Sequence, residues 1–261
     1  MTKLLLKHDL KKSSKVLIIL YIITIGLAVI TRIINIFSYL MVFNVLGSVF
    51  AGLTYSAIAN VLINTFTNIL NYVIKSFFKD ESYLTHTLPV KKSSLLNAKY
   101  LCALILVFSS FIVSLGAFLI IHASAPFFDT LNAFITATIS NFSISVASFI
   151  IVIALLLLSQ ICALMTFAFA SIIKGYSYNN KRALMGLVWF LCFYFSAIIC
   201  MLIVLIIFCL ITGSINELFS SVPSQTTLLN ICIVAIVCYV IFSFLTYLFS
   251  LKIFNKGVNV D

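Results

Sequence analysis

The sequence predicts an all-α integral membrane protein with six transmembrane helices, and three observations support this fold class. The 261 residues are 63% hydrophobic and only 8% charged, whereas a soluble domain carries about 25% charged residues. The apolar residues form continuous runs long enough to cross a bilayer as helices, unlike the ~10-residue alternating segments of a β-barrel. Three prolines and eight glycines are too few to interrupt these runs.

Six spans are predicted within one membrane domain, at about 16–35, 43–74, 100–123, 143–173, 183–211 and 228–251. The second is longer than a bilayer requires, so we expect its end to project into water toward the next loop. A short outer loop is predicted around 124–132. The tail is residues 252–261.

An N-terminal amphipathic helix is predicted over residues 1–15, ahead of the first span. Its lysines recur at every fourth position, at Lys3, Lys7, Lys11 and Lys15. This spacing places them on neighbouring turns of a helix, which is typical of a helix lying on the inner membrane surface.

The distribution of basic residues indicates the orientation of the chain. The formal net charge is +10, and every Lys or Arg except Arg32 lies in the N-terminus, the 75–99 loop, the 174–182 loop or the C-terminus. These are alternate connections of a six-span chain, and such an excess marks the cytoplasmic side. Both termini and both basic loops are therefore predicted to be cytoplasmic. The charge indicates contact with anionic membrane lipid, and no nucleic-acid partner is expected.

Arg32 lies near the outer end of the first predicted span. We expect its guanidinium to reach the outer headgroups, because a charge left in the hydrocarbon is costly. The alternatives are an outer gate residue or an ion-pair partner for Asp129 or Glu217.

The second predicted span carries two polar stripes. At about 100° per residue, one stripe contains Asn44, Ser48 and Tyr55, and the other contains Asn60, Asn64, Thr67 and Asn71. Polar stripes in lipid face protein or a water-filled path. Packing against another helix is one interpretation, and a translocation path is the other. In a dimer one face could serve both.

Several kinds of chemistry are missing from the sequence. It has no G-x-x-x-x-G-K-[ST] motif to bind ATP phosphates and no pair of histidines spaced for a metalloprotease site. All six acidic residues lie in termini or connections, whereas an ion-coupled carrier usually needs a carboxylate inside the membrane. The seven cysteines lie in apolar spans without C-x-x-C spacing. We therefore expect no enzyme activity, no metal site and no cofactor in this chain.

The longest polar interruption is the segment 75–99. Its centre keeps Tyr, Leu and Val between charged borders. Apolar residues in such a loop indicate a docking surface for another protein or a segment that lies on the lipid interface. The residues of this loop alone leave both interpretations open.

The run KDESYLTHTLPV, residues 79–90, resembles the DEGYLT-x-TLPV signature of bacterial ABC-2-type exporter permeases. The match covers about a dozen positions, and the rest of the chain is similar only in the number, spacing and orientation of its helices. Two positions depart from the pattern: Ser82 stands where a Gly is common, and Lys91 where a Ser often opens the next helix. In that family this loop docks on a separately encoded ATPase. The resemblance implies an ATPase-coupling role for Asp80, Glu81, Tyr83, Leu84, Thr85, His86, Thr87, Leu88 and Pro89.

The resemblance further implies a permease subunit of an ABC exporter in the bacterial plasma membrane. Cytoplasmic ABC ATPase subunits would hold ATP and Mg²⁺, and the permease would pair with a second copy or a homologous permease. The cargo implied by the resemblance is an amphipathic antimicrobial or cytolytic peptide. The alternative is a non-transporting membrane anchor or sensor that recruits a cytoplasmic partner through its basic loop. We favour the permease, because an anchor needs neither six spans nor a polar stripe.

Overall fold

The computed structural model describes residues 2–79, 82, 91–122, 125–138, 146–178, 180–213 and 225–256. Every regular element in this part of the chain is a helix. The helices divide into two compact units, with the boundary between Ala123 and Ser124. This boundary follows the third predicted span.

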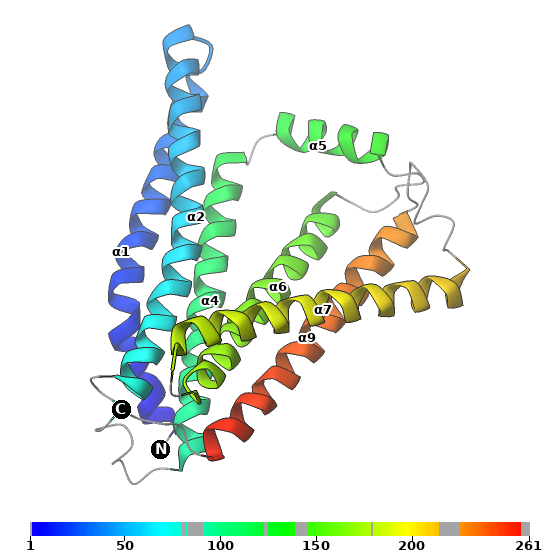
Figure 1. The fold of residues 1–261 in the computed structure, drawn as a ribbon. Helices are drawn as coiled ribbons and strands as arrows, with labels where there is room; N and C mark the ends of the chain where they lie inside the picture. Colours follow the sequence, from blue (N-terminus) through cyan, green and yellow to red (C-terminus); the bar gives the residue numbers. More distant parts are fainter. Residues whose placement is uncertain are drawn as a thin grey trace. The chain divides into compact units, whose positions relative to one another are not determined.

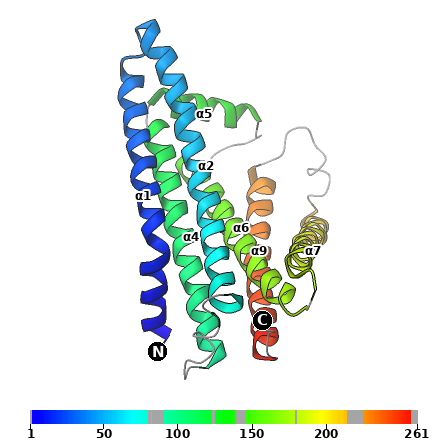
Figure 2. The same ribbon diagram turned by 60° about the vertical axis from the view of Figure 1, so that its left-hand side comes forward.

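Unit 1 is a bundle of three long helices: α1 (Thr2–Ile36), α2 (Met41–Phe78) and α4 (Lys92–His122). Figures 1 and 2 show them side by side, and each contacts the other two. The 38 residues of α2 make a helix roughly 57 Å long, against a hydrocarbon core of about 30 Å. The helix is therefore longer than a bilayer crossing requires, and the projection of its end into water stays a prediction.

The N-terminal segment differs from the expectation. Residues 2–15, expected to form a separate surface helix, continue without a break into the first span as α1. Neither proline nor glycine occurs before Gly26 to interrupt the helix. The side chains of Asp9, Ser13 and Leu17 are buried along one line of α1, so this segment already packs within the bundle.

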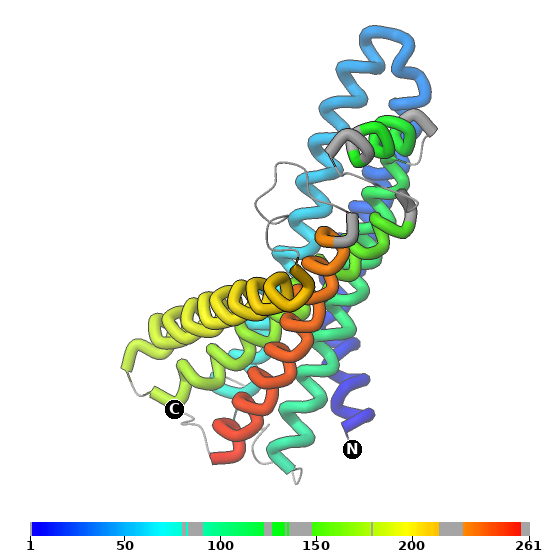
Figure 3. Tube along the Cα trace, turned by 90° about the vertical axis from the view of Figure 1, so that its right-hand side faces the viewer, coloured from blue at the N-terminus to red at the C-terminus, as the bar shows by residue number. Residues whose placement is uncertain are grey.

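Unit 2 contains α5 (Ala125–Thr138), α6 (Val146–Gly175), α7 (Arg182–Thr212) and α9 (Gln225–Lys256). The tube in Figure 3 follows the last three from yellow-green to red, and each of these contacts the other two. The 14-residue α5 occupies the segment expected as an outer loop. At roughly 21 Å it is too short to cross a bilayer.

The helices α6 and α7 approach each other very closely next to the turn that joins them. A Cβ atom added at Gly175 would lie 2.7 Å from the Cα of Gly186, so a side chain at Gly175 would collide with the backbone of α7. Small residues of this kind let two membrane helices pack backbone to backbone. The chain enters α7 through Lys181, whose φ of 53° is left-handed.

Six of the described helices are long and apolar enough to cross a membrane: α1, α2, α4, α6, α7 and α9. They correspond one to one with the six predicted spans. Their outward faces carry large exposed apolar side chains, for example Ile33, Leu187 and Phe244, which lipid would cover. The helices are those expected of a multi-pass membrane protein.

Candidate functional site

The residues singled out for ATPase coupling, Asp80, Glu81 and Tyr83–Pro89, lie outside the described residues. The structure does describe the two helix ends that the segment joins. The helix α2 ends at Phe78, and α4 begins at Lys92. Ser82 is buried, and its backbone N–H donates to the carbonyl oxygen of Lys79 at 2.8 Å.

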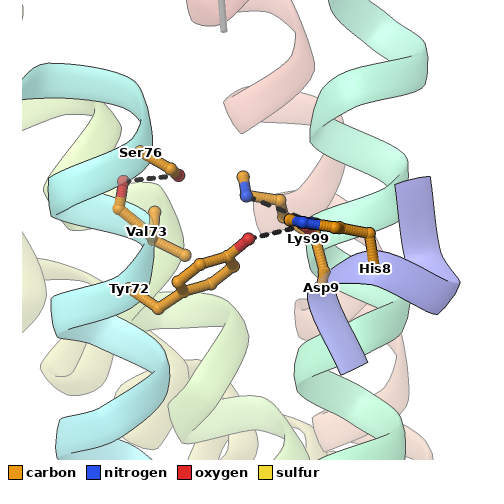
Figure 4. A network of polar contacts seen from close by, with 6 residues as sticks. All are labelled: His8, Asp9, Tyr72, Val73, Ser76 and Lys99. Atoms are coloured by element: carbon orange, nitrogen blue, oxygen red, sulfur yellow. Dashed lines mark hydrogen bonds and ion pairs between the residues drawn. The ribbon is translucent and has the colours of Figure 1, made fainter. Parts of the chain in front are cut away.

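A buried ionic cluster joins the three helices of unit 1 near these ends. We call Asp9, Tyr72 and Lys99 the Asp9 cluster. Asp9, on α1, accepts a hydrogen bond from the Tyr72 hydroxyl of α2 at 2.6 Å. Its other carboxylate oxygen accepts one from the Lys99 ammonium of α4 at 3.3 Å. Figure 4 shows the two donors converging on the carboxylate from two different helices.

The charges of the Asp9 cluster are compensated inside the protein. The side chains of Asp9 and Lys99 are only 8% and 6% exposed. Removing two such charges from water is costly unless they are paired and further satisfied. The Lys99 Nζ lies 4.1 Å from the centroid of the Tyr72 ring and 5.4 Å from that of Phe77, and cation–π attraction strengthens when the cation is desolvated.

The cluster lies about two helical turns from the helix ends that the 80–90 segment joins. Tyr72 is six residues before the end of α2, and Lys99 is seven residues after the start of α4, which is about 10 Å along each helix. One turn before Tyr72, the Asn68 side chain donates to the backbone carbonyl of Ser13 at 2.9 Å. The start of α1 is therefore held to α2 and α4 close to the loop.

Hydroxyl groups continue the connection along the bundle. The Ser110 hydroxyl lies 2.6 Å from the hydroxyls of both Tyr21 and Thr65, so it links all three helices. Farther along, the hydroxyls of Thr31 and Thr54 lie 2.8 Å apart and join α1 to α2. We call these two groups the hydroxyl contacts. Bonds of this kind between membrane helices fix the register in which the helices pack.

The polar stripes predicted on the second span lie on the outside of unit 1. The side chains of Asn44, Ser48, Tyr55, Asn60, Thr67 and Asn71 are exposed, and that of Asn64 is half-buried. Several of these side chains bond within α2 itself, as Asn64 does to the Asn60 carbonyl. Tyr55 differs, because its hydroxyl lies 2.6 Å from His122 Nε2 of α4. The polar residues of α2 that pack the bundle belong to another face.

Sequence reasoning missed the Asp9 cluster. One signal was present, since Asp9 is the only acidic residue among the first 79 and is surrounded by lysines. Lys99 belongs by sequence to the polar 75–99 segment, although its ammonium is buried. Arg32 is half-buried on α1. Of its two proposed partners, Asp129 belongs to unit 2 and Glu217 lies outside the described residues.

The described residues contain no group of three or more His, Cys, Asp or Glu side chains that could hold a metal ion. No protein-family model, curated protein or solved structure matches the chain.

Proposed function

We propose that this chain is the membrane-spanning permease subunit of an ABC exporter of the ABC-2 type. The observation that carries the proposal is the run 79–90, with its DES-YLT-x-TLPV pattern, between the second and third of six long apolar helices. In this proposal the run faces the cytoplasm of a bacterium and docks on a separate ATPase. The cargo is a substrate such as an amphipathic peptide.

The packing of unit 1 supports a coupling role for this loop. A displacement of the 80–90 segment acts directly on the ends of α2 and α4. Because Asp9 is bonded to both Tyr72 and Lys99 about two turns away, α1 is drawn along with them. The Asp9 cluster then transmits the movement of one loop to three helices as a single body.

In this proposal the ATPase subunit and the permease subunit have separate roles. The ATPase holds ATP and Mg²⁺ and performs the hydrolysis, while this chain contributes no catalytic residue. The amide side chains on the outside of α2 are costly to leave in lipid. A second permease copy, a homologous permease or a water-filled path would cover them, and Asn60, Asn64 and Asn71 are the amides concerned.

The proposal is tested by purifying the tagged chain in mild detergent after co-expression with its neighbouring genes. We expect a soluble ATPase to co-purify. Changing Leu84→Asp together with Leu88→Asp places two charges among the apolar side chains of the docking loop. We expect this double variant to insert normally and to lose the ATPase, with at least a tenfold drop in the retained fraction, since desolvated apolar anchors dominate such interfaces.

A matched control adds the same charge elsewhere. Asn180→Asp with Asn255→Asp introduces two carboxylates at exposed positions near the basic helix ends of unit 2. This variant is expected to retain the ATPase. Binding that survives the Leu84/Leu88 change, or that is lost equally in both variants, contradicts docking through this loop.

A further inference from the structure

The short helix α5 (Figure 1) separates apolar from polar side chains more sharply than any other described helix. At about 100° per residue, its described apolar side chains fall within an arc of about 100°. They are Phe127, Phe128, Leu131 and Ile135. Asp129 and Thr130 lie outside this arc and are exposed. The helix therefore has one apolar face and one polar face.

The protein covers the apolar face of α5 only in part. Ile135 is 5% exposed, whereas Phe128 is 37% exposed and Leu131 is half-buried. The Phe128 ring packs edge to face on the ring of its neighbour Phe127, with the centroids 5.6 Å apart. The main contact of α5 with another described helix is a slight one with α6. Apolar surface around Phe128 and Leu131 thus remains open.

The helix α5 requires a further surface for its stability. It has 14 residues, and isolated helices of that length are marginal in water. Asp129 is its only charged residue, so no ion pair between successive turns supports it. Most of the stability of such a helix comes from packing its apolar face, and that packing is incomplete within the protein.

The chain holds α5 at the surface of the bilayer. Since α4 ends at His122 and α5 begins at Ala125, three Cα–Cα steps keep the start of α5 within about 11 Å of the end of a spanning helix. The headgroup layer beyond the hydrocarbon is about 5–8 Å thick on each side. Residues 123–145 contain neither Lys nor Arg, and such a connection is expected on the outer side of the membrane.

We propose that α5 lies flat on the outer leaflet, with Phe128 and Leu131 against the lipid acyl chains and Asp129 and Thr130 toward water. Amphipathic helices of this kind bury their apolar face about 5–10 Å into the boundary between headgroups and acyl chains. Because α5 has no basic residue, apolar contact holds it and the charge of the lipid is unimportant. The inference requires that α4 and α6 span the bilayer and does not depend on the permease assignment.

Tryptophan fluorescence of the full chain in phosphatidylcholine vesicles tests this position. Trp189→Phe removes the only native tryptophan, and Phe128→Trp then places a single probe on the apolar face. Thr130→Trp in the same background is the matched control, because it lies about 160° around the helix from position 128. Both native side chains are exposed, so burial within the protein does not separate the two positions. Lipids brominated on their acyl chains and aqueous iodide serve as the two quenchers.

We expect the brominated lipids to quench the Phe128→Trp probe roughly twofold or more above the Thr130→Trp probe, and iodide to show the reverse order. Replacing phosphatidylcholine by phosphatidylglycerol is expected to leave the bromine ratio unchanged. Equal quenching of the two probes by the brominated lipids would overturn the proposal. A Phe128→Trp probe shielded from both quenchers would show that the apolar face packs on protein, which would overturn it as well.

Discussion

The interiors of the two units are held together by different kinds of contact. In unit 1, polar side chains connect the three helices from one end to the other, beginning at Asp9 and continuing through Ser110 to Thr54. In unit 2, a central group is formed by Ala163, Phe167 and Ala197, with aromatic neighbours packed on it. Its described helices are joined mainly by aromatic and small residues.

The packing of unit 2 depends on shape. Phe193 and Phe249 meet edge to face with their ring centroids 5.4 Å apart, and Trp189 lies beside both. A polar bond between its helices is also present, from Thr246 to Thr166 at 3.3 Å. That bond is longer than the 2.6 Å contacts of unit 1 and so contributes less to register.

This difference indicates how each unit fixes the register in which its helices pack. Between helices in lipid the hydrophobic effect gives little preference for one register, and close packing and hydrogen bonds provide it instead. A bundle held by directional bonds resists sliding of its helices when one end is pushed. In the proposed permease, unit 1 carries the docking loop, so the movement of the ATPase would act on this unit first. Interhelical hydrogen bonds that fix the register of its helices suit that role.

The largest expected effect comes from breaking the buried pair of unit 1. Lys99→Met leaves the Asp9 carboxylate buried with Tyr72 as its remaining strong donor. Removing one partner of a buried ion pair costs about 3–5 kcal/mol, which reversible unfolding in SDS would measure. The double variant Asp9→Asn with Lys99→Met removes both charges and is expected to recover most of the loss. A double variant as unstable as the single one would contradict the ion pair as the cause.

A somewhat smaller loss of stability is expected from a cavity in unit 2. Phe167→Ala leaves a cavity beside Ala163 and Ala197, with an expected cost of about 3 kcal/mol. Unlike Lys99→Met, this change offers no charged partner whose removal could restore stability. Limited proteolysis would report it, with earlier cleavage after residue 124 than before it. Equal exposure of both halves would indicate that the two units unfold together and would contradict their separate packing.

The smallest expected effect concerns the hydroxyl contacts. Ser110→Ala removes the hydroxyl shared by Tyr21 and Thr65 and is expected to cost about 1 kcal/mol, since such bonds within membranes contribute roughly 0.6–1.7 kcal/mol. Ser114→Ala is the matched control one turn farther along α4. Ser114 Oγ is buried without a hydrogen-bond partner, so its removal is expected to be neutral or stabilising. Equal effects at both positions would contradict a register role for Ser110.

The sequence predicted the six long helices because their apolar runs are continuous and nearly free of proline. It did not predict α5, since a 14-residue segment can be a helix or a loop by length alone. The polar stripes of α2 were visible in its periodicity, but periodicity does not tell which stripe meets the neighbouring helices. Thr54 and Thr65 were overlooked for this reason.

The Asp9 cluster could not be predicted, because its residues are far apart in the sequence. Asp9 and Lys99 are separated by 90 residues, and each had an ordinary explanation as a charge in a terminus or loop. Only the packing of α1 against α4 brings them together. The docking loop, by contrast, was proposed from a local pattern, and its residues lie outside the part of the chain that the structure describes.

The accessibility of the docking loop tests the account most directly. His86→Cys, introduced into a variant without the seven native cysteines, would be labelled with a membrane-impermeant maleimide. We expect no labelling in intact cells, strong labelling in inside-out vesicles, and protection there when the co-purifying ATPase is bound. Labelling in intact cells would place the loop outside and contradict the proposed permease, and unchanged labelling with the ATPase bound would contradict docking through residues 80–90.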